Sequence, residues 1–429
     1  MLRHGGSQTC AVEGAYAPRT SRQERRGVLE YDKEGSMLGT IFLVVYIIFQ
    51  TGMSILTEYV IKQNRFYRTI GRKTRIIRVL IYILLAVIPM LGAYLPKCPF
   101  KYFCMEFGNI WLGFFMYYSG LVIVVTIVSH IIHFIIRDKK KKVLGHILNI
   151  SLVLALLVTI GGMYHAQKPR LVNYEINVDK KTESVKELKV VLIADLHLSV
   201  NSDIRATEKM VEEVNSVNPD VVVIAGDIFT STFEGLKNPE KYAACLREMQ
   251  AKYGVYAVCG NHDVEENLFG GFPISPISEA FRTPGMEKFF EDAGFYVLYD
   301  ENVELADGEV ILSGRVDGEK AGDGTSDRMS AAELLGPVDK TKPIIVLQHE
   351  PKQFKDLADN GADVVLCGHT HNGQVFPGNF IVPFFNENAY GVKELYGIDT
   401  IVTAGVGYYG PPLRVGTDSE VTVVTIKFK

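Results

Sequence analysis

The sequence lacks several features that would place a chain in a simple class. Its 429 residues contain only six cysteines, too few for a dense disulfide framework. It has no internal repeat and no low-complexity segment. The formal net charge of -4 argues against a nucleic-acid binder driven by bulk charge. The length predicts two or three structural units, each with its own core.

Four of the six cysteines lie in two kinds of sequence context. Cys259 and Cys367 each stand in an apolar run directly before a glycine, which favours small buried hydrophobic residues. Cys98 and Cys104 lie in a short loop between two apolar segments. They could pair if that loop faces an oxidising space, and the sequence leaves this open.

Long apolar runs are abundant in the N-terminal part. Four of them reach the roughly 20 residues that cross a bilayer, and they cover about 37–57, 77–96, 109–135 and 143–163. Four such runs in succession favour transmembrane helices over the buried helices of a soluble protein. His130 and His133, near the end of the third run, are expected at the membrane interface rather than in a proton or ligand site.

Basic residues predict the orientation of these spans. They are concentrated after the first and third runs (Lys62, Arg65, Arg68, Arg72, Lys73, Arg75; Arg137 and 139–142) and are sparse after the second. Cytoplasmic loops carry such an excess. We therefore expect a multi-pass protein of the cell membrane whose C-terminal domain is extracytoplasmic.

Residues 1–36 conflict with this orientation because their own basic residues favour the cytoplasm. They have no apolar periodicity and no secretory hydrophobic region. We expect either an upstream read-through before a natural start at Met37, or a disordered tail whose charge is outweighed by the two internal loops.

A water-soluble domain is expected after the four spans of 37–164. Residues 165–184 form a linker and entry strand, and 185–429 form the domain. Short apolar, β-branched runs predict strands, several of them buried on both faces: Leu188–Ala194, Val221–Ala225, Val255–Cys259, Val310–Ser313, Ile344–Leu347, Val364–Cys367, Ile401–Ala404 and Val421–Phe428. Helical patterns at 203–217, 238–251 and 286–293 alternate with the early strands, which predicts an α/β fold with a second sheet packed on the first.

Histidines are scarce after residue 170, and their positions are informative. There are five, and all lie in polar clusters that follow predicted strands. The clusters are Asp195-Leu196-His197, Gly226-Asp227, Gly260-Asn261-His262-Asp263, Gln348-His349 and His369-Thr370-His371. Ligands collect at the carboxyl ends of strands in open α/β sheets, so we expect these side chains to meet there.

The mixture of carboxylate, imidazole and carboxamide groups suits divalent metals such as Mn, Fe, Zn or Ni. No cysteine belongs to the set, which disfavours a structural zinc site. Seven ligands are too many for one tetrahedral ion but suit two ions that share a carboxylate. Two such ions can generate a hydroxide at neutral pH and hold the oxygens of a phosphoryl group.

Taken together in this order, the five clusters resemble the calcineurin-like metallophosphoesterase family. The resemblance covers residues from about 185 to the C-terminus and implies a two-sheet sandwich flanked by helices. It also implies that Asp195, His197, Asp227 and His371 hold one metal, and that Asp227, Asn261, His349 and His369 hold the other. His262 would lie beside the scissile phosphate, and Asp263 would orient its ring. Thr370 and Gly373 are expected to shape the turn.

The end of the chain is similar to a membrane-associated bacterial branch of this family. Asn372 stands where that branch usually has a second glycine, which leaves the ligand set intact. Arg414, in a loop that also matches the branch, is expected either to reach the phosphate or to form a structural ion pair. The long segment 264–284, rich in aromatic residues and glycine, is expected to bind substrate, act as a lid or cover the core.

The sequence thus predicts a membrane-anchored phosphoesterase in which a dimetal-bound hydroxide hydrolyses a phosphodiester or pyrophosphate of a lipid, nucleotide or envelope precursor. The expected partners are this substrate, in free or lipid-linked form, and membrane lipids, but no nucleic-acid polymer. A phosphomonoesterase and a non-catalytic, metal-dependent envelope sensor remain as alternatives.

Overall fold

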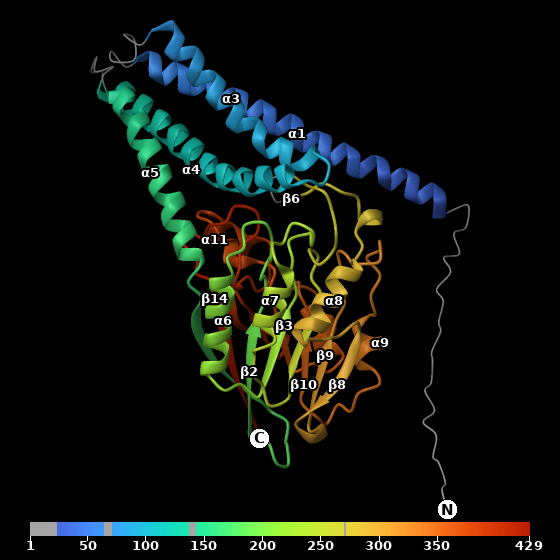
Figure 1. Cartoon of the computed structure of the whole chain (residues 1–429). Helices are drawn as coiled ribbons and strands as arrows, with labels where there is room; N and C mark the ends of the chain where they lie inside the picture. Colours follow the sequence, from blue (N-terminus) through green and yellow to red (C-terminus); the bar gives the residue numbers. More distant parts are fainter. Residues whose placement is uncertain (1–23, 64–70, 137–142, 270–271) are drawn as a thin grey trace, which may run out of the picture.

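The structure, a computed structural model, describes residues 24–63, 71–136, 143–269 and 272–429. Long helices form its N-terminal part and an α/β domain forms its C-terminal part (Figure 1). The helices are α1 (Glu24–Gln63), α3 (Arg72–Tyr94), α4 (Pro99–Ile136) and α5 (Val143–Ala166).

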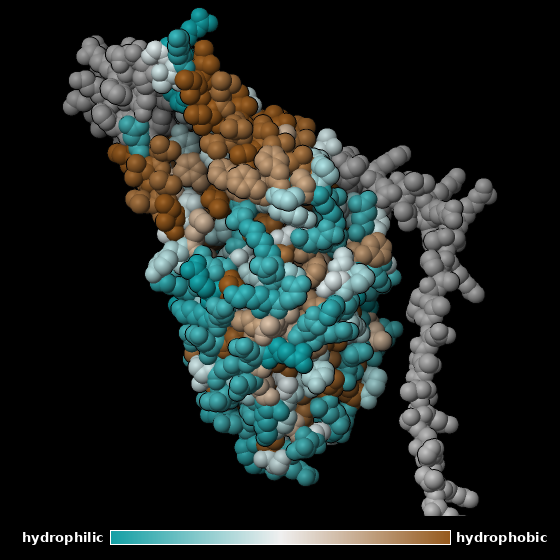
Figure 2. Space-filling view, in the orientation of Figure 1, coloured by the Kyte–Doolittle hydropathy of each residue, from teal (hydrophilic) through white to brown (hydrophobic). Residues whose placement is uncertain are grey.

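Each of these helices contains a stretch long and apolar enough to cross a membrane: Thr40–Tyr59, Arg72–Tyr94, Pro99–Val128 and Asn149–Ala166. The prediction of four candidate spans is confirmed at this level. Apolar side chains cover the outside of the helical part, whereas polar ones dominate the surface of the domain (Figure 2). An apolar exterior of this kind is typical of helices that face lipid.

Two helix boundaries differ from the expected ones by ten residues or more. α1 begins at Glu24, so residues 24–36, which were assigned to the tail, are helical; residues 1–23 lie outside the described part. α4 begins at Pro99, ten residues before the third expected span, because the loop after α3 is short. Within the part of the chain that the structure describes, Cys98 and Cys104 are both free thiols. His130 contacts the carbonyl oxygen of Thr126 on its own helix, and the side chain of His133 lies outside the described residues.

Two six-stranded sheets form the domain. The first has the order β1 (Arg170–Val178), β14 (Glu420–Phe428), β2 (Glu187–Ile193), β3 (Val221–Ala225), β4 (Val255–Val258), β7 (Tyr296–Val297). The second has the order β12 (Gly391–Leu395), β13 (Ile398–Val402), β11 (Val364–Cys367), β10 (Ile344–Leu347), β9 (Val310–Gly314), β8 (Glu301–Leu305). β5 (Leu268–Phe269) and β6 (Phe272–Pro273) form a small separate ribbon.

Side chains point alternately to the two faces of each strand, which explains how the layers of the domain pack. In β2, Leu188, Val190 and Leu192 point into the core between the sheets, while Val191 and Ile193 face the helices on the other side. That outer face is covered by α6 (Ile204–Ser216), α7 (Pro239–Leu246) and α8 (Pro284–Ala293). α9 (Ala331–Leu335) and α10 (Phe354–Asp359) cover the second sheet. The predicted α/β sandwich flanked by helices is confirmed.

Short helical turns complete the domain. They are η1 (Ile277–Glu279), η2 (Ala306–Gly308), η3 (His371–Gly373), α11 (Gly378–Ile381) and η4 (Val382–Phe384). The last three follow β11 and lead back to the edge strand β12.

The carboxyl ends of the inner strands face the membrane helices. β2, β3 and β4 are parallel to one another, as are β9, β10 and β11. Their carboxyl ends lie under α4 (Figure 1). The loop after β2 is held to this helix, because the side chain of Asn109 donates to Asn201 over 2.8 Å and Asn201 donates to the carbonyl oxygen of Glu106.

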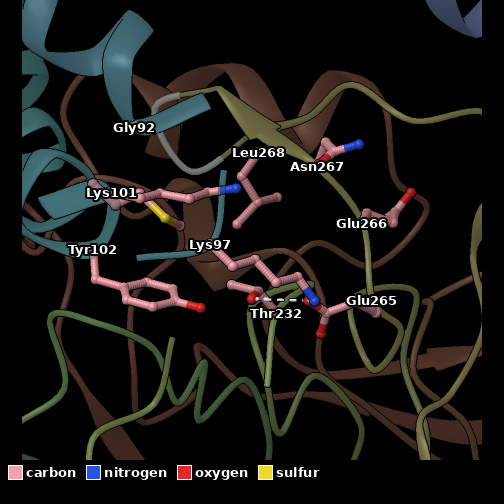
Figure 3. A pocket seen from close by; sticks show the side chains of 10 residues that line it. Gly92, Lys97, Lys101, Tyr102, Thr232, Glu265, Glu266, Asn267 and Leu268 are labelled. Carbon is pink, nitrogen blue, oxygen red and sulfur yellow. Dashed lines mark hydrogen bonds and ion pairs between the residues drawn. The ribbon is translucent and has the colours of Figure 1, made fainter. Parts of the chain in front are cut away.

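A hollow lies at the same boundary, between the α3–α4 turn and the segment after β4 (Figure 3). Lys97 from the turn approaches Glu265 and forms a 2.7 Å ion pair with Glu234. These pairs are largely exposed, so they position the turn more than they stabilise the fold.

The domain is also joined closely to α5. Only residues 167–169 separate Ala166 from Arg170, the first residue of β1. Ser419 donates through its hydroxyl to the carbonyl oxygen of Ala166, and its own carbonyl accepts from Arg170. β1 then pairs along its whole length with β14, so the last span continues into the sheet with little slack.

Candidate metal centre

Every predicted ligand lies where a strand ends. Asp195 and His197 follow β2, Asp227 follows β3, Asn261 follows β4, His349 follows β10, and His369 and His371 follow β11. Five of these residues have left-handed backbone conformations, with φ between 46° and 76° (Asp195, His197, Asp227, His369 and His371). Such conformations cost about 1 kcal/mol or more each and concentrate at functional sites.

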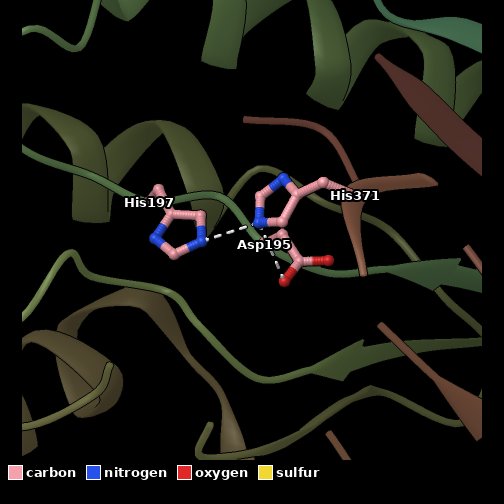
Figure 4. A group of neighbouring side chains, drawn as sticks. All are labelled: Asp195, His197 and His371. Carbon is pink, nitrogen blue, oxygen red and sulfur yellow. Dashed lines mark hydrogen bonds and ion pairs between the residues drawn. The ribbon is translucent and has the colours of Figure 1, made fainter. Parts of the chain in front are cut away.

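The structure brings these side chains together in two groups. Asp195, His197 and His371 form one, and Asp227, His349 and His369 form the other. Within each group the candidate ligand atoms lie within 4.8 Å of one another. Figure 4 shows the first group, in which the Nε2 atoms of His197 and His371 are 3.0 Å apart.

Asp227 connects the two groups. Its Oδ2 atom lies 3.5 Å from Nε2 of His197 and 3.1 Å from Nε2 of His349. Its other oxygen, Oδ1, accepts from the backbone N–H of His262 at 2.9 Å, which fixes the plane of the carboxylate. One carboxylate therefore reaches both groups, as a shared ligand must.

Two glycines make this approach possible. Gly226 has φ 77°, and a Cβ there would lie 2.8 Å from Nδ1 of His349. A Cβ on Gly260 would lie 2.3 Å from Oδ1 of Asp227. Any larger residue at either position would push the second group apart.

The donor set fits divalent ions. Oδ1 of Asn261 is buried and has no hydrogen-bond partner among the described residues, an arrangement that is costly unless a cation takes the lone pairs. His349 contacts the carbonyl oxygen of Ala225 through Nδ1 at 2.7 Å, which makes Nδ1 the donor and leaves Nε2 to bind a metal. His197 contacts the hydroxyl of Thr230 through Nδ1 in a similar way.

Burial and neighbouring charges set the protonation of the metal-free ligands. Burial lowers the pKa of His197 and of His369 to about 4, and it holds the pKa of His371 well below its usual range. Neutral imidazoles of this kind present the lone pairs that metals need.

Asp195 and His349 have the opposite tendency, because the charge of Asp227 acts on both. Burial, together with the charge of Asp227, raises the pKa of Asp195 to about 7. Burial opposes a charge on His349, but the Asp227 carboxylate overcomes it and raises the pKa of His349 above its usual value. The same pairing lowers the pKa of Asp227 against its own burial.

His262 lies beside the first group, and its ring is not held as expected. Both oxygens of Asp263 accept from backbone N–H groups, those of Phe229 and Gly260, each at 2.8 Å. The ring of His262 instead contacts the hydroxyl of Ser231 through Nδ1 at 2.8 Å. The predicted orienting role of Asp263 is therefore corrected: Asp263 fixes the loop backbone because its oxygens are already engaged there.

Ser231 is the first member of a buried chain that the sequence did not reveal. Its hydroxyl donates to Glu266 at 3.0 Å, and Glu266 forms a 2.7 Å ion pair with Lys320. Ser231 lies four residues after Asp227, and Glu266 lies four residues after His262. Ser231 and Glu266 are therefore remote in the sequence and meet because the segments after β3 and β4 lie side by side.

Tyr409 covers the site and was also missed. Its ring stacks on that of His262 at 4.5 Å and lies 5.4 Å from that of His197. Phe272, from the segment 264–284, meets Tyr409 edge-on at 5.2 Å, while Phe269 packs against Tyr46 of α1. The segment 264–284 thus covers part of the site and forms part of the boundary between the helices and the domain.

Arg414 is structural. It is buried, and its guanidinium donates to backbone carbonyls, including those of Ala404, Gly407 and His371. Among the described residues it forms no ion pair, because backbone carbonyls surround its guanidinium. Its expected contact with the phosphate stays a prediction. Thr370 and Gly373 shape the turn as predicted: the Thr370 hydroxyl accepts from the N–H of Asn372 and donates to Ala389.

Comparisons with known proteins agree with this geometry. The model of the calcineurin-like phosphoesterase family matches residues 188–373. An uncharacterized metallophosphoesterase from Helicobacter pylori (strain J99) is 31% identical over 293 residues, which are 67% of this chain and 72% of that protein. The chain belongs to the calcineurin-like phosphoesterase family.

Other relatives of this metallophosphoesterase include one from Aquifex aeolicus, 32% identical over 61% of this chain and 92% of that protein. A zebrafish (Danio rerio) protein called a transmembrane protein with metallophosphoesterase domain is 32% identical over 64% of this chain. The matched region spans only 61% of the zebrafish protein. Family members are hydrolases that act on phosphoester bonds, and both metal-ligand groups are present here.

Proposed function

We propose that this chain is a membrane-anchored, metal-dependent phosphoesterase that hydrolyses a phosphodiester or pyrophosphate of a lipid, nucleotide or envelope precursor. The observation that carries the proposal is the carboxylate of Asp227, which lies within 3.5 Å of imidazoles from both ligand groups. The buried Oδ1 of Asn261, which has no hydrogen-bond partner among the described residues, supports the proposal independently.

Two divalent ions fit the donors on hand. Asp195, His197, Asp227 and His371 would hold one, and Asp227, Asn261, His349 and His369 would hold the other. When bound, such ions supply an activated water and positive charge for phosphoryl oxygens. Their identity is left to experiment, since Mn, Fe, Zn and Ni all accept this mixture of donors.

His262 is the group proposed to act on the substrate itself. The hydroxyl of Ser231 donates a hydrogen bond to Glu266, so its oxygen accepts one from Nδ1 of His262. Nε2 is then the ring atom that can hold or move a proton at the leaving oxygen. Tyr409 stacks over the ring and excludes water from that side.

The membrane sidedness is also proposed. α5 enters the domain directly, so the domain lies at the end of the spans opposite to the ends of α1 and α3 that carry Lys62 and Arg72 (Figure 1). Basic residues favour the cytoplasm, which supports an extracytoplasmic position of the domain. A C-terminal alkaline phosphatase fusion, active only outside the cytoplasm, should be active; an inactive fusion would reverse the orientation.

The test of the function uses the full chain purified in detergent and loaded with Mn²⁺ or Zn²⁺. We expect turnover of bis(p-nitrophenyl) phosphate that chelation abolishes and metal restores. No turnover with either metal, at full metal content, would refute the enzyme and leave a metal-dependent sensor.

A further inference from the structure

An exposed aromatic surface follows the last metal ligands. Phe376, Phe380, Ile381, Phe384 and Phe385, here called the aromatic patch, lie in and around α11 and η4. Their exposed fractions are between 48% and 84%, the highest at Phe384 and Phe385. Residues 375–386 carry no charged side chain. A contiguous apolar surface of this kind marks a site of contact.

The aromatic patch is continuous with the membrane-spanning part. Tyr117 of α4 donates through its hydroxyl to the carbonyl oxygen of Phe376 over 3.4 Å. Phe376 in turn donates through its backbone to Val415, whose side chain would meet a Cβ on Gly162 of α5 at 2.9 Å. α11 thus lies beneath α4 and close to α5 (Figure 1).

This position decides what covers the patch. Tyr117 falls within the candidate span Pro99–Val128, and Gly162 within Asn149–Ala166. The aromatic patch therefore lies next to the lipid-exposed surface of the helices, at the end of the domain that faces the membrane. Uncharged aromatic and branched side chains at such a boundary partition into the headgroup and acyl region.

The patch is coupled rigidly to the metal centre. Gly373 has φ 76°, and a Cβ there would lie 2.2 Å from the backbone of Gly378, the first residue of α11. The N–H of Gly378 also donates to the carbonyl oxygen of Val375. α11 is packed in this way against η3, which carries the ligand His371.

We propose that the aromatic patch penetrates the bilayer beside the metal centre, and that the phosphoester cleaved there belongs to a membrane lipid. The second clause rests on the proposed function and deepens it. A phosphate held at the headgroup level reaches the ligands while its acyl chains stay in the membrane. A water-soluble nucleotide gains nothing from the patch.

The insertion of the aromatic patch into the bilayer is measured first, in an experiment that does not depend on turnover. The chain has a single tryptophan, Trp111, which is buried among the helices. In a Trp111→Phe background, Phe384→Trp introduces one probe into the patch. Tyr296→Trp is the matched control, because Tyr296 is 63% exposed on β7, at the edge of the first sheet away from β1.

The full chain is reconstituted in vesicles of phosphatidylcholine and phosphatidylglycerol, with and without brominated acyl chains. We expect blue-shifted emission from Phe384→Trp and loss of that emission with brominated lipid, while Tyr296→Trp is quenched by aqueous iodide alone. Equal iodide quenching at both positions, with no effect of bromine, would overturn the insertion.

The substrate class is tested with two esters of the same chemistry. One is bis(p-nitrophenyl) phosphate in water, and the other is a diacylglycerol p-nitrophenyl phosphodiester in the vesicles. Phe384→Gln should lower turnover of the lipid about tenfold and leave the soluble ester unchanged, with Tyr296→Gln changing neither. Equal loss on both esters would overturn the lipid assignment. Absence of turnover in the parent chain would refute the proposed function, whereas the quenching result would still decide the insertion.

Discussion

At the scale of single residues, the group proposed to transfer protons is distinct from the proposed metal ligands. His262 lies outside both ligand groups, yet its ring stacks under Tyr409 beside His197. We expect His262→Ala to lower kcat by about 10²–10⁴-fold while both ions stay bound. Turnover and metal content by mass spectrometry are measured on the same sample. Loss of an ion in parallel with activity would make His262 a ligand.

Ser231 is expected to position that ring. Ser231→Ala removes the partner of Nδ1 and should lower kcat roughly tenfold, with KM and metal content unchanged. Ser231→Cys keeps a side chain of similar size that can accept from Nδ1 and should restore part of the rate; threonine is unsuitable, because a β-branched residue would be strained at the φ of 43° found here. If the cysteine variant is as slow as the alanine variant, the effect comes from packing and not from the hydrogen bond.

Asp227 is expected to control both ions at once. Asp227→Asn weakens the one carboxylate that reaches both groups, so the purified protein should lose both metals. Asp359→Asn, on an exposed carboxylate of α10 that pairs with Lys355, is the control and should keep them. Retention of two ions by Asp227→Asn would exclude the shared ligand.

At the scale of elements, close backbone contacts hold the ligand loops. Gly373→Ala forces a Cβ into the backbone of Gly378 at φ 76°, and we expect it to destabilise the domain by about 1–3 kcal/mol and to weaken binding at His371. Gly397 has a similar φ of 80°, but apart from its chain neighbours no described residue has an atom within 4 Å of its Cβ position. Gly397→Ala should therefore cost only the backbone strain, about 1 kcal/mol. Thermal unfolding and metal content compare the two, and equal effects would mean that the contact is unimportant.

The sequence predicts some elements much better than others. β3, β10 and β11 begin and end where expected, because their continuous Val, Ile and Leu runs are buried on both faces. β7 and β12 were missed because they are short or carry polar residues, and only their neighbours in the sheet define them. Metal-competent residues are visible from their position after strands. Ser231 and Tyr409 are not, because their contacts join loops that are remote along the chain.

At the scale of the whole molecule, metal binding and proton binding compete. In the metal-free protein, burial raises the pKa of Asp195 to about 7, and the Asp227 carboxylate raises that of His349 despite burial. Both groups therefore retain protons near pH 7, which an incoming cation must displace.

We expect Mn²⁺ binding near pH 7 to release protons, and its affinity to fall as the pH is lowered from 8 to 6. Calorimetry in buffers of different ionisation enthalpy measures the release. Because binding to the folded state stabilises it, added Mn²⁺ should also raise Tm more at pH 8 than at pH 6. Binding enthalpies that do not depend on the buffer would contradict the assigned protonation.

The junction between Ala166 and Arg170 has a kinetic consequence. Three residues separate the helix from the sheet, and Ser419 is hydrogen-bonded to both Ala166 and Arg170. The domain is therefore held next to the end of α5. For any phosphoester that stays in the bilayer, encounter then becomes a two-dimensional search. Velocity should follow the mole fraction of that lipid in the leaflet, and diluting the surface with inert lipid should slow the reaction even at constant bulk concentration.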